Sequence, residues 1–348
     1  MVENSLFRPL QTALVLILAL IAVALCASIA PPALQRTVIE ALIKLTVVVG
    51  LFIFVGQSGV FSFGHVAFMA IGGYMSAILT LAPARKATLL DLPGAIEALQ
   101  LPWPLALVAV IVAVGVLATV VGWPFCRLRG IALPMATFAL LIITYVVASN
   151  WQQVTGGRQA LVGLPRYVGL WTAFGGAALA ILVAAGYAMT RHALMLRCSR
   201  ESEVAAAATG IDVERERLIA FVLSAMVVAA GGVLFSHFIG TITASTFYLD
   251  LTFVTLTMLV VGGMRSLTGA CAGVALVSLV SELLRSVERG VAIGDVTIAA
   301  PPGLQEIVLA ALLLAILVLR PAGLLGDAEI GWPSFRRAAP ATATRQQG

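Results

Sequence analysis

The sequence predicts an all-α, polytopic transmembrane helical bundle. Three observations predict this class: 61% of the 348 residues are hydrophobic, only 11% are charged, and the mean hydropathy is +1.06. Apolar runs of roughly 18 or more residues can cross a bilayer core, and such runs recur along the whole chain. No stretch is left over for a soluble domain.

The apolar runs predict about ten membrane segments. The expected segments are residues 11–30, 37–56, 62–82, 104–123, 131–149, 171–190, 217–238, 249–264, 267–284 and 305–319. Prolines punctuate the connections, for example Pro31-Pro32, Pro102 and Pro165. A proline removes a backbone donor and ends a helix, so these positions are typical of helix boundaries.

The distribution of basic residues predicts the orientation. Ten crossings place both termini on one side, and most of the 21 lysines and arginines lie there, notably in the loop 191–217. The positive-inside rule makes that side cytoplasmic. We expect residues 1–36 to hold the N-terminus and first membrane helix, residues 37–326 the main bundle, and residues 327–348 a disordered cytoplasmic tail.

The net charge of +5 does not indicate a nucleic-acid partner. The only lysines are Lys44 and Lys86, and the arginines are scattered between apolar runs, so no basic stripe exists to neutralise phosphates. Membrane lipid is the expected surrounding. The four cysteines are isolated, with no C-x-x-C pair and no nearby histidine, so no metal site is predicted.

The stretch 56–77 combines polar side chains and glycines inside an apolar, membrane-length segment. An unsatisfied polar group in hydrocarbon costs several kcal/mol, so such residues usually face a protein interior or a water-filled path. The pattern favours a broken or re-entrant helix. The candidates for lining a translocation path are Gln57, Ser58, Ser62, His65 and Tyr74. For His65, a structural hydrogen bond between helices is the alternative.

The loop 191–217 is the longest charged stretch and predicts a short helix at its centre. Ser202 or Ser199 can cap this helix, Glu203 favours its N-terminus, an alanine run propagates it, and Gly210 ends it in a left-handed turn. Such a helix at the cytoplasmic end of a bundle suits docking into another protein. The alternative is a solvated loop helix.

Other polar residues give weaker signals. Arg158 and Arg166 lie in a glycine-containing outer loop that suits an acidic partner, although such a loop can be merely solvated. Asp250 and Glu282 lie near segment ends, so no carboxylate for proton coupling is placed near the midplane. The three histidines lie in separate regions, and no catalytic residues are predicted.

Several sequence pieces, in this order, resemble permease subunits of branched-chain amino acid ABC importers, specifically the M-type subunit. The resemblance extends from about residue 38 to 326 and makes residues 37–326 an importer permease domain. The pieces are Gly56-Gln57-Ser58-Gly59 through Tyr74, Arg129-Gly130-Ile131-Ala132, Thr155-Gly156-Gly157 with Gly163-Leu164-Pro165, the loop 203–210, Val261-Gly262-Gly263-Met264, Glu282-Leu283-Leu284-Arg285 and Arg320-Pro321-Ala322-Gly323-Leu324.

The resemblance implies that Glu203, Ala206 and Gly210 form the coupling helix that seats on an ATP-binding subunit. It implies a bacterial inner-membrane location and three kinds of partner: an H-type permease, two ATPase subunits and a periplasmic substrate-binding protein, which Arg158 and Arg166 would help to dock. The chain itself has no Gly-x-x-x-x-Gly-Lys-Ser/Thr segment. ATP is therefore expected to be hydrolysed by partner subunits, with no cofactor in this chain.

Two other function classes remain open at this stage. A secondary transporter or channel would need no ATPase, and an intramembrane enzyme would need catalytic residues clustered at one depth. The solute also stays open, because members of the family are associated with amino acids, urea, short amides and aromatic acids.

Overall fold

The computed structural model describes residues 8–90, 93–288, 291–293, 296–298, 301, 303–320, 322–326 and 328–329. The predicted tail 327–348 therefore lies outside the described residues, except for residues 328 and 329.

The predicted all-α membrane fold is confirmed, and a helix occupies each of the ten predicted segments. These helices are α2 (Arg8–Ile29), α3 (Pro32–Ser58), α4 (His65–Thr80), α7 (Trp103–Phe125), α8 (Ala132–Asn150), α10 (Leu170–Ala188), α13 (Val213–Ile239), α14 (Leu249–Gly262), α15 (Leu267–Glu288) and α16 (Leu304–Leu319). In the described part of the chain, eight helical spans are long and apolar enough to cross a membrane, while α4 and α16 are shorter apolar helices.

Short elements connect the long helices. They are α5 (Pro83–Leu89), α6 (Gly94–Glu97), α9 (Gln152–Thr155), α11 (Arg191–Glu201), α12 (Glu203–Ala208), the 3-10 helix η1 (Ala244–Phe247), and the strands β1 (Leu161–Val162), β2 (Thr241–Ile242), β3 (Val291–Ile293) and β4 (Val296–Ile298). The strands form two antiparallel pairs, β1 with β2 and β3 with β4.

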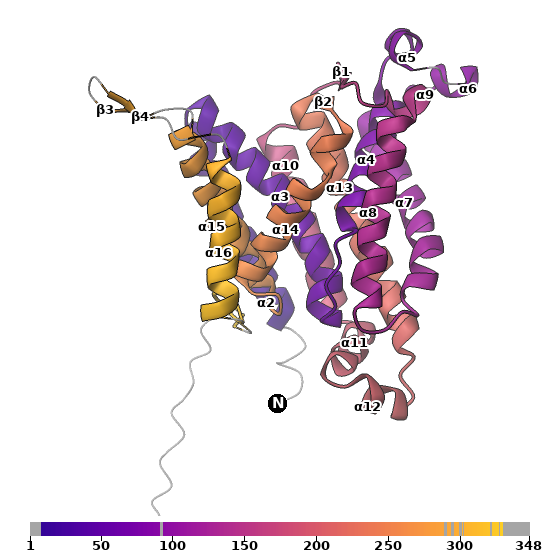
Figure 1. Ribbon diagram of the computed structural model, residues 1–348, viewed down its shortest axis with the longest axis vertical. Helices are drawn as coiled ribbons and strands as arrows, with labels where there is room; N and C mark the ends of the chain where they lie inside the picture. Colours follow the sequence, from indigo (N-terminus) through magenta and orange to yellow (C-terminus); the bar gives the residue numbers. More distant parts are fainter. Residues whose placement is uncertain are drawn as a thin grey trace, which may run out of the picture.

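The short elements gather at the two ends of the bundle (Figure 1). Helices α11 and α12 lie at one end, which we call the α12 end, whereas α5, α6, α9 and the four strands lie at the opposite end. The N-terminal end of α2 and the C-terminal end of α16 reach the α12 end. This arrangement agrees with an even number of crossings.

Helix α13 forms the centre of the bundle and packs most extensively against α4 and α3. Its N-terminus is capped by Asp212, whose Oδ1 accepts from the Arg215 amide at 3.2 Å, and it ends at Gly240 in the left-handed region. Glycines allow its close approach to α4. A Cβ atom at Gly232 would overlap the carbonyl oxygen of Met69.

At the opposite end, the β1–β2 pair joins the α9 region to the connection after α13. Leu161 pairs with Ile242 and Val162 with Thr241. The amides of Gly163 and Leu164 then both donate to the Gly240 carbonyl, at 3.2 and 3.1 Å. This loop is therefore hydrogen-bonded to the bundle rather than loosely tethered.

At the α12 end, the segment after α16 folds back over the turn between α14 and α15. The Leu324 amide donates to the Val261 carbonyl at 2.9 Å. The carboxylate of Glu329 accepts from the amides of Leu267 and Thr268, at 2.8 and 3.2 Å, and from the Thr268 hydroxyl at 2.8 Å. These amides begin α15, so Glu329 satisfies donors that a helix leaves open at its N-terminus.

The close approach of α13 to α4 predicts the effect of a single methyl group. We expect Gly232→Ala to destabilise the protein by about 1–3 kcal/mol, because the added carbon meets a backbone carbonyl that has little room to move. Thermal unfolding of the purified protein in detergent measures this loss. The matched control is Gly175→Ala in α10, where an added Cβ has no neighbour within 4 Å. Equal melting temperatures for both variants would contradict the packing argument.

Candidate functional site

A break in the chain inside the bundle separates α3 from α4. Gly59 adopts φ +72° and ends α3, and the chain then stays non-helical through Gly64. The 16 residues of α4 span about 24 Å, which is shorter than a hydrocarbon core of about 30 Å. The extended chain before α4 therefore makes up part of the crossing, and Figure 1 shows it rising from the α12 end into the bundle.

Protein groups satisfy part of the backbone of this break. The Val60 amide donates to Ser58 Oγ at 3.2 Å, and the Phe63 amide donates to Thr137 Oγ1 of α8 at 3.2 Å. Gly64 lies directly against α8, because a Cβ there would overlap the Thr137 carbonyl oxygen. Non-helical backbone is tolerated at membrane depth only where protein or a water-filled cavity covers it, and α8 provides that cover.

Ser62 and His65 meet at the start of α4. Ser62 Oγ lies 2.7 Å from His65 Nδ1, and both side chains are only 1% exposed. Three aromatic rings surround the imidazole: Phe54, Phe68 and Phe221, with centroid separations of 5.4, 6.3 and 5.3 Å. His65 Nε2 has no hydrogen-bond partner among the described residues. This bond joins His65 to the non-helical stretch just before α4, so it is not the bond between helices named as the alternative, and the role of His65 stays a prediction.

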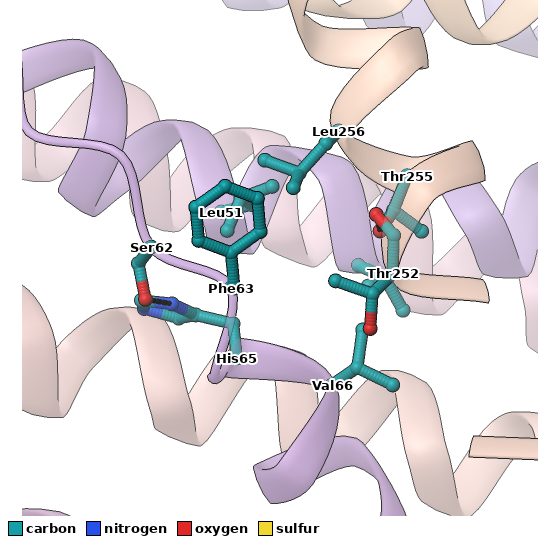
Figure 2. A pocket seen from close by; sticks show the side chains of 9 residues that line it. Leu51, Ser62, Phe63, His65, Val66, Thr252, Thr255 and Leu256 are labelled. Carbon is teal, nitrogen blue, oxygen red and sulfur yellow. Dashed lines mark hydrogen bonds between the residues drawn. The ribbon is translucent and has the colours of Figure 1, made fainter. Parts of the chain in front are cut away.

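A small cavity of about 10 Å³ adjoins the Ser62–His65 pair. Figure 2 shows the two residues joined by their hydrogen bond, with Phe63 beside them and Thr252 and Thr255 of α14 across the cavity. Thr252 Oγ1 donates to the carbonyl of Tyr248, just before α14, and Thr255 Oγ1 donates to the Leu251 carbonyl of the same helix, both at 2.9 Å. The volume suits about one water molecule and is far too small for an amino acid.

The other predicted path residues lie apart from this pair, and all are buried. Gln57 is 3% exposed, and its Oε1 accepts a hydrogen bond from Arg197 Nε of α11. Ser58 Oγ donates to the carbonyl one turn earlier in its own helix at 2.7 Å. Tyr74 packs against Phe247, with 6.3 Å between ring centroids. Whether any of these side chains lines a path stays a prediction.

The helix predicted within the loop 191–217 is present as α12, and ion pairs attach it to the bundle. Glu203 Oε2 lies 3.0 Å from Arg217 Nη2 of α13, and Glu203 Oε1 lies 3.4 Å from Arg129 Nε in the α7–α8 connection. Ser202 Oγ accepts from the Ala205 amide at 3.2 Å and caps the helix. Gly210 follows α12 with φ +87°, a left-handed conformation that favours glycine.

Two of the residues predicted for coupling, Glu203 and Ala206, attach α12 to the bundle, and other residues of the same helix are exposed. Ala206 is 4% exposed, and Glu203 turns toward Arg217, so both hold α12 in place. The face turned away from the bundle carries Val204, 82% exposed, with exposed alanines at 205, 207 and 208. Val204 was not among the predicted site residues, although a large apolar residue in an exposed alanine helix is a usable signal.

Arg158 and Arg166 are both exposed at the opposite end of the bundle. Arg166 lies against Gly240, whose added Cβ would come within 2.9 Å of Arg166 Nε. Beneath this surface, Thr155 Oγ1 donates to the Ala148 carbonyl at 2.7 Å. The loop is therefore held by contacts to the bundle. Its role in docking stays a prediction.

A charged cluster that was not predicted from the sequence lies between α3 and α15. Glu40 lies 2.7 Å from Lys44 and 3.6 Å from Arg285, and Arg285 lies 3.9 Å from Glu282. Glu40 stands in the first third of α3 and pairs with Arg285 in the last turn of α15, so this carboxylate lies toward one end of the bundle rather than at its midplane. Lys44 and Arg285 balance its charge through these ion pairs, which does not suit a group that must take up and release protons.

Two arginines of α11 that were not singled out contact the end of α3. Arg197 bonds Gln57, and Arg200 Nη1 donates to the Gly56 carbonyl at 2.8 Å. Burial and, to a smaller extent, the nearby Arg200 charge lower the pKa of Arg197. An arginine guanidinium remains charged under ordinary conditions, so both side chains are cations at this helix end.

The described part of the chain contains no cluster of candidate metal ligands. No three His, Cys, Asp or Glu side chains gather there as metal ligands would. His192 pairs with Glu216 at 2.8 Å, and His237 Nδ1 lies 2.9 Å from the Pro165 carbonyl oxygen. The histidines thus have separate surroundings. All four cysteines are free thiols.

Comparisons with known proteins give a consistent result. A sequence family described as branched-chain amino acid transport system / permease component matches residues 33–317. Two similar proteins are the high-affinity branched-chain amino acid transport system permease proteins LivM of Salmonella typhimurium (strain LT2) and Escherichia coli (strain K12), at 25% and 24% identity over 311 residues. The alignments cover 79% of this chain and 66% of each relative, just under two thirds of their length. No solved structure matches the chain.

The attachment of α12 predicts unequal roles for two neighbouring glutamates. We expect Glu203→Ala to destabilise the protein by about 1–3 kcal/mol, because Arg217, only 7% exposed, loses its partner. Thermal unfolding of the purified protein measures the loss. The control is Glu201→Ala, whose side chain is 69% exposed, and an exposed pair contributes roughly 0–1 kcal/mol. The attachment would be disproved if Glu203→Ala cost no more than Glu201→Ala.

Proposed function

Because this chain belongs to the family of permease components of branched-chain amino acid transport systems, we propose that it is the transmembrane subunit of an ATP-driven importer. It carries branched-chain amino acids, or a related small polar solute, across the bacterial inner membrane. The observation that carries the proposal is the family match over residues 33–317, which includes nearly the whole helical bundle.

The surface at the α12 end supports the binding of a partner protein there. Helix α12 is anchored by Glu203 and Ala206, and it presents Val204 and the exposed alanines away from the bundle. A helix that is anchored on one side and apolar on its outer face can bind in a groove of another protein. We assign that groove to an ATPase subunit, which makes the α12 end cytoplasmic.

The complete importer would contain several chains. This chain would pair with an H-type permease, two ATPase subunits would bind at the α12 end, and a periplasmic binding protein would deliver solute at the opposite end, near Arg158 and Arg166. ATP hydrolysis falls to the ATPase subunits, because the sequence lacks a phosphate-binding loop. The chain itself would be no enzyme and would hold no cofactor.

The mechanism would be alternating access. Closure of the ATPase subunits on ATP would move α12, and the helices attached to it would follow, opening a path past the break between α3 and α4. The closed packing around His65 supports a gate there rather than an open pore, since the adjoining cavity holds about one water molecule.

A secondary transporter or channel is the second candidate function. It is less well supported, because the carboxylate of Glu40 in α3 is ion-paired with Lys44 and Arg285. A proton-coupled mechanism requires a carboxylate that changes protonation state during the cycle. The energy source therefore separates the two candidates.

The direct test is uptake into vesicles. We expect radiolabelled leucine to accumulate when the chain is reconstituted with its H-type permease, ATPase subunits and binding protein, and only when ATP is enclosed on the side of the α12 end. Urea, acetamide and benzoate, tested in the same way, identify the solute if leucine is not carried. Uptake by the chain alone, driven by a proton gradient and independent of ATP, would establish the secondary transporter instead.

The exposed face of α12 predicts a second outcome. We expect Val204→Glu to weaken binding of the ATPase subunits about tenfold or more, because a charge would be buried at an apolar contact. Co-purification at graded ATPase concentrations measures the affinity. The control is Val162→Glu on β1, an exposed valine at the opposite end. ATPase binding that is equally strong in both variants would remove α12 from the interface.

A further inference from the structure

The end of α3 is the point where the bundle is interrupted, and its last turn is held by another element. Gly56 and Gln57 form that turn, and α3 ends with Gly59 in the left-handed region. The last carbonyls of a helix have no partner within it, and cations there interact favourably with the helix dipole. Here two arginines of α11 take that role.

Three contacts join α11 to this turn. Arg197 Nε donates to Gln57 Oε1, and Arg200 Nη1 donates to the Gly56 carbonyl at 2.8 Å. The aliphatic part of Arg200 also covers Gly59, since a Cβ there would lie 2.5 Å from Arg200 Cγ. With Gln57 only 3% exposed, the contact is enclosed and leaves little space to slide.

The same segment continues almost directly into α12. A single residue, Ser202, separates α11 from α12: its amide donates to the Cys198 carbonyl of α11, and its hydroxyl accepts from the Ala205 amide and caps α12. Helix α12 is also attached to α13 through Glu203 and Arg217. A displacement of α12 therefore acts on α3 and on α13.

Helices α3 and α13 are both connected to α4, the helix that follows the break. Helix α13 packs most extensively on α4, and α3 continues through residues 59–64 into His65 of α4. From this geometry we infer that Arg197 and Arg200 are positioning residues that transmit movement of α12 to the α3–α4 break, with Gln57 as the receiving side chain. Gln57 then acts through its contact with Arg197 and does not bind the solute.

This inference rests on the proposed function, so its test uses the reconstituted importer of this chain, the H-type permease, the ATPase subunits and the binding protein. The quantity measured is solute imported per ATP hydrolysed. We expect Arg197→Met to lower this ratio about tenfold or more, within the range of typical coupling free energies. The matched control is Arg191→Met, which removes the same charge from the exposed start of the same helix and leaves the ratio unchanged.

Variants of Gln57 separate a transmitting contact from a solute contact. Gln57→Leu removes the acceptor and should lower the ratio as Arg197→Met does, whereas Gln57→Glu keeps an acceptor for Arg197 and should preserve it. The double variant Arg197→Met with Gln57→Leu should match the more impaired single variant within about twofold, because both remove one interaction. Melting temperatures and co-purification of the ATPase identify any variant that misfolds.

The outcomes of these experiments test the inference separately from the proposed function. A wild-type ratio in Arg197→Met, or losses in the double variant that multiply independently, would overturn the inference while ATP-driven uptake by the wild type upholds the proposed function. Loss of coupling in Gln57→Glu at normal folding would also overturn it, because the side chain would then be needed as an amide. If the wild type shows no ATP-dependent uptake, the inference and the proposed function are both wrong.

Discussion

The structure depends on one constraint: a polypeptide that leaves the helical conformation inside a membrane must still satisfy its backbone polar groups. The stretch after Gly59 meets this constraint with borrowed partners, since Ser58 accepts from Val60 and Thr137 of α8 accepts from Phe63. Helix α8 must lie where it does for the break to exist. The break in turn determines where α4 begins and which side chains surround His65.

Much of the bundle could be predicted from the sequence, because the relevant signals are local. Run length and composition locate the membrane helices, and prolines mark their limits, as Pro31 does before α3. The capped helix 203–208 followed by Gly210 was also predicted from residue types alone. The polar residues between Gln57 and His65 correctly indicated a broken helix, because such groups are too costly to leave in lipid.

The partners of those residues could not be predicted, because they are set by packing between distant parts of the chain. Gln57 bonds Arg197, 140 residues away, and the sequence around either residue does not indicate its partner. The pairing of Glu40 with Lys44 was overlooked for a different reason: two charges among apolar neighbours hardly lower the mean hydropathy of a segment. The full ion pairing of Glu40 becomes evident only when the fold places Arg285 beside it.

The fold-back of the segment after α16 has a practical consequence for anyone who shortens or extends this chain. Glu329 accepts from the first amides of α15, so the folded unit reaches beyond the last membrane helix. A truncation ending at Leu319 would preserve every predicted crossing and still strip those amides of their acceptor. Affinity tags and fluorescent reporters are therefore better joined well after Glu329, with a linker that leaves this carboxylate free to reach its helix.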